Sequence, residues 1–310
     1  MVEYSSDLVR QLQIRRTRMI FVNIIVILLV VAISASVVIS LMVGWNLTHP
    51  VKEPIANFPE NVGLTYSQIQ IDSDGLLLDG WLAPGFEDDQ RVVIVAHGYA
   101  NNRSYDAPAL ATAVQLQQLG IATILFDFRN SGRSEGDITG VGYFERRDLA
   151  RVIEYARDEG YTSIGILGLS MGGATALITA PDYPEVKAIA TDSAFADLRP
   201  YLEENLPLWS NLPATPFNWL ILNLMPLVTG IDVDEVRPIK SIQLMQDRAF
   251  LFIHANGDAR IPSANSQQLA DVAGPNAELW LTQGTKHVGS YQSNPELYLD
   301  KVVSLMVRNL

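Results

Sequence analysis

A serine between two glycines is the first feature of this sequence that could do chemistry. Gly168 and Gly172 lie two residues on either side of Ser170. The apolar run 163–167 predicts a buried strand, and the small residues 173–177 predict the start of a helix. A serine on the sharp turn between a strand and a helix exposes its hydroxyl above the sheet, and the glycines leave room for the crowded backbone. This context predicts that Ser170 is a nucleophile.

A serine hydroxyl is a poor nucleophile at neutral pH and needs a neighbouring base. The chain has four histidines that could supply one. His49 lies ahead of the predicted fold, and His97 and His254 each follow a predicted strand, where we expect local hydrogen bonds. His287 lies in a glycine-flanked loop after the last predicted strand. Because that loop can reach over the serine, we predict His287 as the base.

The base needs a carboxylate that orients its ring and stabilises the imidazolium. Asp258 follows the predicted strand 250–253 and precedes His287, which gives the chain order serine, acid, histidine. Asp192, after the preceding strand, remains an alternative acid. We favour Asp258, because Asp192 and Ser193 open a long insertion and are typical of a helix entry.

Attack on an acyl carbon creates an oxyanion that needs backbone N–H donors. We predict that Met171 supplies one, at the positive end of the helix after the nucleophile. We predict that Tyr99 supplies the other, because Gly98 lets the backbone turn close to the site and His97 supports this loop. The ring of Tyr99 fits two roles equally well, lining an acyl pocket or covering the loop.

The elements that position these residues alternate between strands and helices. Residues 68–71 and 76–82 flank a Ser-Asp-Gly turn and predict a hairpin. Continuous apolar runs predict central parallel strands at 92–96, 122–126, 164–167, 188–191 and 250–253, with a last strand at 278–281. Helices are predicted at 107–119, 144–159, 172–180, 263–272 and 296–307. The pattern predicts an α/β fold with a mostly parallel, doubly wound sheet.

One segment, about 197–246, is too long for an ordinary connection between a strand and a helix. It is rich in leucine, tryptophan and proline, so we predict a helical cap insertion. The cap either only packs on the main domain, or it also walls an apolar acyl pocket or touches a membrane surface.

An uncharged stretch near the N-terminus predicts a membrane anchor. Residues 19–43 contain no charged side chain. At 1.5 Å per residue, a helix of this length exceeds the roughly 30 Å hydrocarbon core of a bilayer. A cleaved signal peptide is the alternative, but its apolar region normally covers only about 7–15 residues.

Arginines set the predicted orientation of this anchor. Four lie within residues 10–18, whereas Lys52 is the only lysine or arginine in the short segment after the span. The positive-inside rule then predicts a single-pass protein of the cell membrane, with a cytoplasmic N-terminus and an extracytoplasmic catalytic domain. The predicted organisation is a cytoplasmic segment 1–18, a transmembrane signal anchor 19–43, a juxtamembrane linker 44–66 and an α/β domain 67–310.

The overall charge and the lack of cysteine exclude several classes of function. The formal net charge is −12, which disfavours binding to nucleic acid phosphates. Without cysteine, the chain has no disulfide, no thiolate metal site and no cysteine nucleophile. We expect no metal ion and no organic cofactor, because the predicted serine, imidazole, carboxylate and N–H groups fill every role. The oligomeric state stays open.

The motifs, in their order along the chain, resemble those of the α/β-hydrolases. They are the segments 97–99, 127–134 and 168–173, followed by Asp258 and His287. The chain is most similar to membrane-anchored bacterial serine hydrolases of the serine aminopeptidase-like or alpha/beta-hydrolase-domain group. That group is in turn similar to eukaryotic depalmitoylating and lysophospholipase-type hydrolases.

The resemblance covers about residues 65–310 and implies the α/β-hydrolase fold with a serine-hydrolase triad. It also implies that the segment 127–134 is a structural loop beside the site, in which Arg129 holds neighbouring loops together. The resemblance says little about the substrate, because this superfamily hosts many reactions.

We therefore predict a hydrolase that forms an acyl-enzyme on Ser170. An apolar cap and a membrane anchor favour an ester or thioester with an acyl chain as the small-molecule substrate. One alternative is a serine peptidase of the same fold, with Glu203 and Glu204 of the cap as partners for a free amine. Another is a membrane-tethered binding scaffold, although a scaffold has no need of a nucleophile, a base and an acid.

Overall fold

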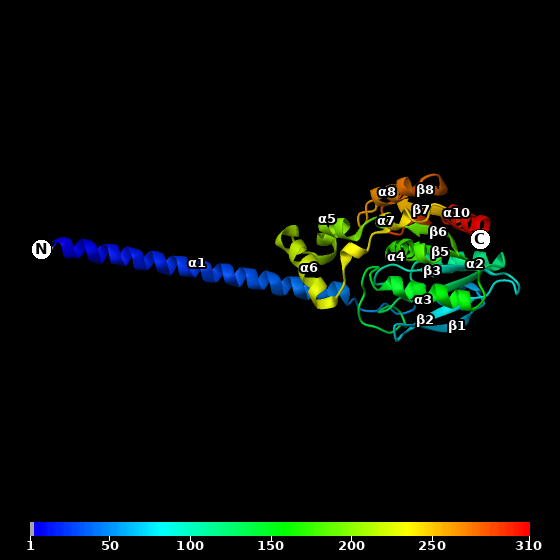
Figure 1. Cartoon of the computed structure of the whole chain (residues 1–310), viewed down its shortest axis with the longest axis horizontal. Helices are drawn as coiled ribbons and strands as arrows, with labels where there is room; N and C mark the ends of the chain where they lie inside the picture. The colour runs from blue at the N-terminus through cyan, green and yellow to red at the C-terminus, as the bar shows by residue number, and fades with distance from the viewer. Residues whose placement is uncertain (1–2) are drawn as a thin grey trace.

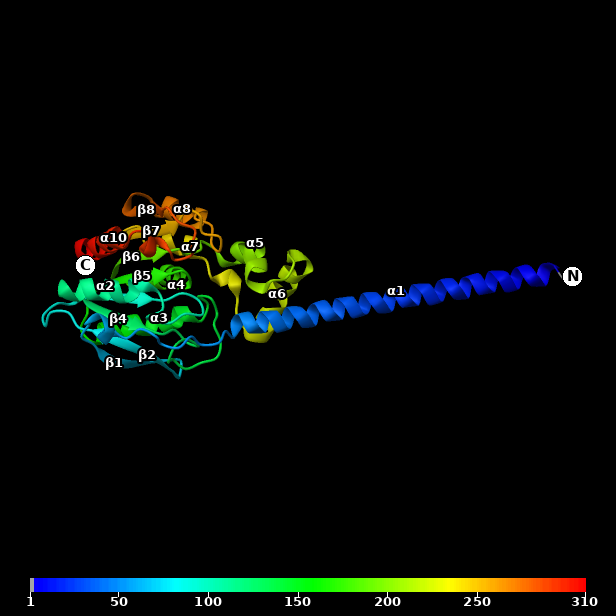
Figure 2. The same ribbon diagram turned by 180° about the vertical axis from the view of Figure 1, so that it is seen from behind.

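The computed structural model describes residues 3–310, with side chains from residue 8 onward. A long helix, α1 (Glu3–Thr48), leads into a rounded domain that contains the strands (Figures 1 and 2). By its length and apolar composition, α1 could cross a membrane between Leu8 and Thr48. The first two residues of the predicted segment 1–18 lie outside the described residues.

The domain is built on one eight-stranded sheet in the order β1-β2-β4-β3-β5-β6-β7-β8. The strands are β1 (Ser67–Ser73), β2 (Leu76–Ala83), β3 (Arg91–Ala96), β4 (Ala122–Phe126), β5 (Ser163–Leu169), β6 (Val186–Asp192), β7 (Ala249–Ala255) and β8 (Ala277–Thr282). Strand β2 pairs antiparallel with β1 and β4, and all other neighbours are parallel. The predicted mostly parallel, doubly wound sheet is confirmed.

The predicted hairpin joins β1 and β2 by a tight turn. Asp74 and Gly75 both have positive φ, 55° and 82°. Two-residue hairpin turns of type I′ require positive φ at both positions, which a short polar side chain and a glycine tolerate. The turn puts Ser73 opposite Leu76 and so sets the register of the pair.

Helices cover both faces of the sheet. They are α2 (Ala107–Gln118), α3 (Glu145–Asp158), α4 (Met171–Thr179), α7 (Pro238–Ile242), α8 (Ala264–Ala273), α9 (Ser290–Ser293) and α10 (Pro295–Asn309). In β3, Val92 and Ile94 pack into the layer that contains α3, α4, α7 and α8. Val93 and Val95 pack into the opposite layer, with α2 and α10. Burial on both faces explains why the central strands are continuous apolar runs.

The predicted cap segment, about 197–246, divides into two parts. The helices α5 (Leu198–Ser210) and α6 (Ala214–Thr229) project beyond the sheet and lie alongside α1 (Figures 1 and 2). Helix α7, by contrast, packs against α4 and α8 in the body of the domain. Only α5 and α6 therefore stand over the end of the sheet as a cap.

The segment between α1 and β1 is bound to the domain surface. Helix α1 itself continues beyond the end of the predicted span. After it, the Lys52 ammonium donates to the Ser134 carbonyl at 2.6 Å, and the Asn102 side chain donates to the Glu53 carbonyl at 3.2 Å. These contacts fix the position of α1 relative to the sheet.

Candidate active site

Ser170 lies on the turn between β5 and α4, at the carboxyl edge of the sheet. Its backbone has φ 51° and ψ −114°, a conformation that is rare outside glycine and is held here by neighbouring structure. A Cβ atom added to Gly172 would lie 2.1 Å from the Ala96 carbonyl oxygen. A Cβ atom on Gly168 would lie 2.4 Å from the backbone of α4. Both glycines are therefore required for the tight turn that presents the serine.

The structure brings Ser170, His287 and Asp258 into one hydrogen-bonded line. His287 Nε2 lies 2.8 Å from Ser170 Oγ, and His287 Nδ1 lies 2.7 Å from Asp258 Oδ2. With the Asp258 carboxylate accepting from Nδ1–H, Nε2 is left as an acceptor for the serine proton. Ser170 and His287 are 117 positions apart along the chain, and Asp258 and His287 are 29 positions apart. The tertiary fold therefore brings the three residues together.

Asp258 is held in its charged form. Its second oxygen accepts the backbone N–H groups of Arg260 at 2.8 Å and Ile261 at 3.1 Å. Burial by itself would raise the pKa of Asp258, but hydrogen bonds from His254 and His287 outweigh it and hold the pKa well below the usual range. The carboxylate is therefore ionised at any pH at which the imidazole can act as a base.

Asp192, the alternative acid, makes no hydrogen bond to His287 among the described residues. Its Oδ1 accepts a hydrogen bond from the Ser193 hydroxyl at 2.9 Å, and its Oδ2 has no partner among the described residues. Complete burial raises the pKa of Asp192 to about 6. The same Ser193 hydroxyl accepts the N–H of Val288 at 3.2 Å, so this pair supports the loop that carries His287.

Asp192→Asn should stabilise the protein more at about pH 8 than at about pH 5. The raised pKa means that the folded state holds the proton more tightly than the unfolded chain. The stability from this group is therefore complete below its unfolded pKa of 3.8 and is lost as the pH rises through about 6. Asparagine mimics the protonated form, so the gain over wild type at the higher pH should be about 1–3 kcal/mol.

Urea denaturation of the full-length protein in detergent at both pH values measures this difference. The exposed Asp300, changed to asparagine, provides the matched control and should show no such pH dependence. Equal effects of Asp192→Asn at both pH values would contradict the assignment of a raised pKa.

The other strand-end histidines are locked by local hydrogen bonds. His97 Nε2 accepts from the Phe128 N–H at 3.0 Å, and its Nδ1–H donates to the Gly98 carbonyl at 2.8 Å. Burial lowers the pKa of His97 to about 4, so this ring is neutral. His254 contacts the Ser266 hydroxyl at 2.7 Å. Both rings are therefore held by neighbouring groups, and His287 is the histidine that contacts the serine hydroxyl.

Two backbone N–H groups beside Ser170 are unpaired. Met171 begins α4, and neither its N–H nor that of Tyr99 donates to another residue in the part of the chain that the structure describes. A Cβ atom on Gly98 would be in ordinary contact with Ser170 Cβ, at 3.5 Å, so the loop before Tyr99 lies against the serine. The two predicted donors thus lie on the two segments that meet at the nucleophile.

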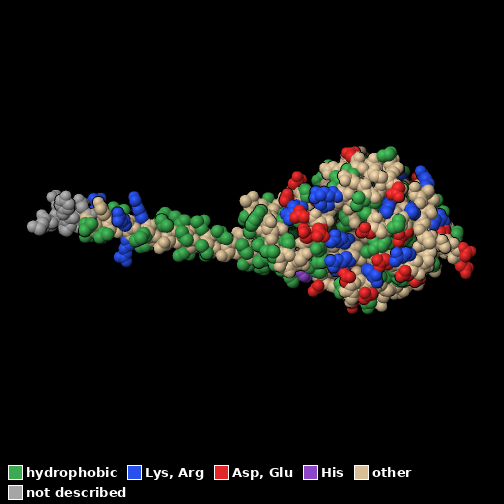
Figure 3. Space-filling view, in the orientation of Figure 1, with side chains coloured by type: hydrophobic (Ala, Val, Ile, Leu, Met, Phe, Trp, Pro, Cys, Tyr) green, Lys and Arg blue, Asp and Glu red, His purple; other side chains and the backbone are tan. Residues whose placement is uncertain are grey.

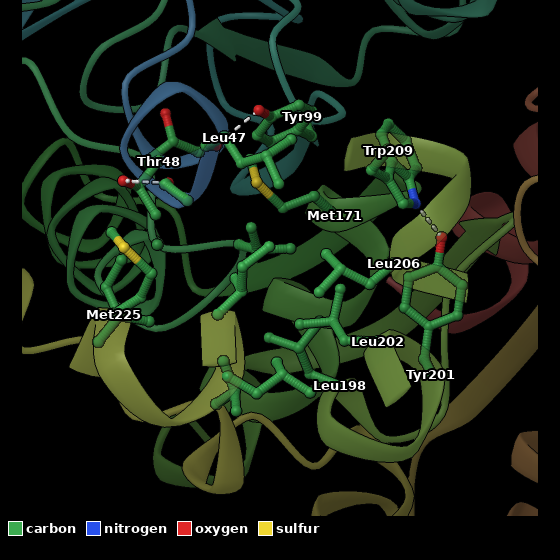
Figure 4. Close-up of a pocket in the computed structure, with 18 of the residues that line it drawn as sticks. Leu47, Thr48, Tyr99, Met171, Leu198, Tyr201, Leu202, Leu206, Trp209 and Met225 are labelled. Carbon is green, nitrogen blue, oxygen red and sulfur yellow. Dashed lines mark hydrogen bonds between the residues drawn. The ribbon is translucent and has the colours of Figure 1, made fainter. Parts of the chain in front are cut away.

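Ser170 lines a largely apolar pocket, and Figure 4 shows the side chains of many of the other lining residues. Its empty space is about 900 Å³, part of which is open to solvent. Cap residues form much of the lining, among them Leu198, Tyr201, Leu202, Leu206, Trp209, Ile221, Leu222 and Met225. None of the described residues that line it is charged. The pocket is therefore suited to an uncharged, apolar group next to the serine.

The ring of Tyr99 lines this pocket. Its hydroxyl donates to the Leu47 carbonyl of α1 at 2.6 Å, and its ring meets that of Trp209 edge to face, with 5.8 Å between the centroids (Figure 4). Burial raises the pKa of Tyr99 to about 12, so the hydroxyl keeps its proton. Of the two roles considered for this ring, lining the pocket is the one that the structure shows.

Two groups of residues at the site have no counterpart in the sequence predictions. The end of α1 contributes Gly44, Leu47 and Thr48 to the pocket. The sequence carries one sign that the helix extends this far. No charged residue occurs between Arg18 and Lys52, and the first proline that would stop the helix is Pro50.

The second group is centred on Arg103, in the loop between β3 and α2 that also carries Tyr99. Arg103 is buried there, pairs with Asp79 and Asp127, and stacks 4.3 Å over the ring of Trp81. Its backbone N–H also donates to Asp127 at 2.8 Å. Only Asp127 of this cluster belongs to a predicted motif, the loop 127–134, because the members of the cluster come from separate elements.

The structure also places the remaining predicted groups. Arg129 forms a bidentate ion pair with Asp148 of α3, at 2.7 and 2.9 Å, and so joins a loop to a helix. Glu203 and Glu204 are exposed on α5 and do not line the pocket. In the described residues, no group of three or more side chains could hold a metal ion.

Comparison with known proteins identifies the fold. A family model described as the alpha/beta hydrolase fold matches residues 91–223. The chain is 29% identical over 222 residues to YqkD of Bacillus subtilis (strain 168), a protein described as uncharacterized, covering 68% of this chain and 69% of that protein. It is 24% identical to the uncharacterized protein Rv2307c of Mycobacterium tuberculosis (strain H37Rv), covering 76% and 75% of the two chains.

Solved structures of esterases superpose on this chain and have the same fold. The esterase Pf2001 of Pyrococcus furiosus superposes with a TM-score of 0.68 at 24% identity, covering 85% of this chain and 98% of the esterase. Est1E of Butyrivibrio proteoclasticus, with ferulic acid bound, superposes with a TM-score of 0.63 at 20% identity, covering 78% of this chain and 98% of Est1E. The chain therefore has the alpha/beta hydrolase fold, and the predicted resemblance to the α/β-hydrolases is confirmed.

Proposed function

We propose that this protein is a serine hydrolase that cleaves an ester or thioester of an acyl group. The observation that carries the proposal is the hydrogen-bonded line from Ser170 through His287 to Asp258, which ends at the floor of an uncharged pocket. The alpha/beta hydrolase fold and its esterase neighbours support this assignment as a hydrolase.

The proposed reaction follows from the geometry. The Ser170 oxygen attacks the acyl carbon while its proton passes to Nε2 of His287, and Asp258 stabilises the imidazolium. The N–H groups of Met171 and Tyr99 bind the oxyanion of the tetrahedral intermediate. When the carbonyl re-forms, the bond to the leaving group breaks, and the imidazolium gives its proton to the departing alcohol or thiol. Water, activated by the same imidazole, then hydrolyses the acyl-enzyme and releases the acid.

The alternatives receive less support from the site. A peptidase that holds a free amine needs a charged partner in the pocket, but Glu203 and Glu204 lie outside it and the pocket lining is uncharged. A scaffold that only binds has no requirement for a strained serine whose hydroxyl meets an oriented imidazole. Both features match a nucleophile.

We also propose that α1 is an uncleaved signal anchor with a cytoplasmic N-terminus. The described helix is long and apolar enough to span a bilayer, and the arginines at 10–18 precede its uncharged part. The remainder of the chain, with the hydrolase domain, would then lie on the extracytoplasmic side.

A series of soluble nitrophenyl esters with increasing acyl length tests the substrate class. Each methylene buried in an apolar pocket contributes up to about 0.8 kcal/mol, so kcat/KM of the full-length protein should rise at least about tenfold from acetyl to octanoyl. Aminoacyl nitroanilides run in parallel as the test of a peptidase. A flat acyl series, or faster cleavage of the anilides, would contradict the proposal.

Leu202→Trp should remove the preference for longer chains. Leu202 is half-buried and lines the pocket, so a larger ring fills space that the acyl chain would take. We expect kcat/KM for octanoyl ester to fall about tenfold, with acetyl ester changed less than about twofold. Leu208→Trp, on the exposed side of the same helix, is the matched control and should leave the series unchanged.

A further inference from the structure

Helix α1, which is long and apolar enough to span a membrane, forms part of the pocket beside Ser170. Gly44, Leu47 and Thr48, in the last turns of α1, line the pocket together with Met225 of α6. The two helices approach so closely that a Cβ atom on Gly44 would lie 2.4 Å from Met225 Cγ. One wall of the pocket is therefore the direct continuation of the helix that could span the bilayer (Figure 4).

Hydrogen bonds fix this wall to the catalytic loops. The Leu47 carbonyl accepts from the Tyr99 hydroxyl at 2.6 Å, and the Thr48 carbonyl accepts from the Thr139 N–H at 2.7 Å. Tyr99 and Thr139 also line the pocket. The end of α1 thus has a defined position relative to Ser170 and does not act as a loose tether.

The cap offers an apolar surface on the same side. The sequence from Asn205 to Ile231 contains no charged residue. Within it, Leu208 is 56% exposed and Trp219 is 67% exposed. The cap helices lie alongside α1, and hydrophobic side chains cover α1 and continue onto the adjoining end of the domain (Figures 1 and 3). Such a surface is suited to the interface of a bilayer.

The length of α1 gives the depth of the pocket relative to that bilayer. A hydrocarbon core of roughly 30 Å takes about 20 helical residues, so a span that begins after Arg18 ends near Val38. Gly44 then lies about 9 Å further along an untilted helix, at the outer edge of the headgroup region, and tilt of the helix brings it closer to the hydrocarbon. The ester bonds that join acyl chains to a lipid lie at the boundary between headgroups and hydrocarbon, within about 10 Å of this position.

We propose that the substrate is an acyl ester or thioester that resides in the same bilayer, and that its acyl chain enters the pocket from the membrane along α1 and α6. This inference rests on the proposed function. It assigns α1 a second role beyond anchoring, as a wall of the site that guides a membrane-resident chain to Ser170.

The test uses the full-length protein in phosphatidylcholine vesicles and follows the fluorescence of released methylumbelliferone. Methylumbelliferyl palmitate is supplied either in the same vesicles or in separate vesicles at the same total concentration. Methylumbelliferyl butyrate, which dissolves in water, reports the chemistry at Ser170 independently of the membrane. We expect hydrolysis of the palmitate to be at least about tenfold faster when it shares the vesicle with the protein.

A pair of cap substitutions separates membrane access from catalysis. The double variant Leu208→Glu/Trp219→Glu puts charges on the proposed membrane surface. It should lower same-vesicle palmitate hydrolysis about tenfold or more, with butyrate hydrolysis within about twofold of wild type. The matched control is Phe86→Glu/Leu244→Glu, which changes two apolar residues of similar exposure, 65% and 74%, outside α5 and α6. It should leave both activities unchanged.

The outcomes distinguish the two proposals. Normal butyrate hydrolysis with equal palmitate rates in shared and separate vesicles would overturn access from the bilayer and leave the serine hydrolase standing. Access from the bilayer would also be overturned if the cap variant and the control variant behaved alike. If the wild type hydrolysed neither ester and a fluorophosphonate failed to label it, the proposed function and this inference would both be overturned.

Discussion

Ser170→Ala is expected to abolish covalent labelling by a fluorophosphonate and to lower kcat for ester hydrolysis by about 10⁴-fold or more. The proposed acyl-enzyme forms on the Ser170 oxygen, which faces His287 Nε2, and alanine removes this oxygen. The unpaired N–H groups and the pocket would still bind an ester, so a small residual rate should persist. Ser170 is almost fully buried within the turn, and the loss of one oxygen should barely change the fold.

Labelling and rates should be measured on the full-length protein in detergent or vesicles, because α1 contributes to the pocket. Ser67→Ala, at an exposed position in β1, is the control and should be labelled like wild type. Undiminished labelling of Ser170→Ala would place the reactive nucleophile elsewhere and refute the proposed mechanism.

Asp258→Asn should lower kcat by about 10³–10⁴-fold, whereas Asp192→Asn should change it less than about threefold. An asparagine at 258 can offer its amide N–H to His287 Nδ1, which would favour the tautomer whose Nε2 carries a proton. That ring could no longer accept the proton of Ser170. Asp192 makes its contact to Ser193 and holds no hydrogen bond to His287, so asparagine preserves its role.

Steady-state kinetics of both variants on octanoyl ester decides between the two carboxylates. The pH profile adds a second readout, because the loss in Asp258→Asn should persist across the accessible pH range. A larger loss in Asp192→Asn than in Asp258→Asn would show that the acid of the triad has been misassigned.

Much of the fold is predictable from local sequence. The strands appear as apolar runs because both faces of a doubly wound sheet are covered, as the alternate packing of Val92 and Val93 shows. The hairpin follows from Asp74 and Gly75, whose positive φ the short turn requires. The serine turn follows from Gly168 and Gly172, because no other residue fits the space that the structure gives them.

The residues proposed for catalysis are predictable as a set, but their partnership is not a local property. Chain order and position after strands single out His287, and they favour Asp258 over Asp192. Only the structure shows which carboxylate faces the imidazole, because both aspartates follow neighbouring strands at the same edge of the sheet. The position of the loop that carries His287 decides between them, because it places His287 Nδ1 2.7 Å from Asp258 Oδ2.

The sequence by itself determined the α/β class, the serine turn, the chain order of the proposed nucleophile, acid and base, and the apolar helix α1. Each of these depends on residues that are close along the chain. The tertiary structure alone decided that α1 and the cap enclose a single pocket above Ser170. That arrangement depends on contacts such as Gly44 with Met225 and Leu47 with Tyr99. No spacing along the chain encodes these contacts, because they form only when the cap packs against the end of α1.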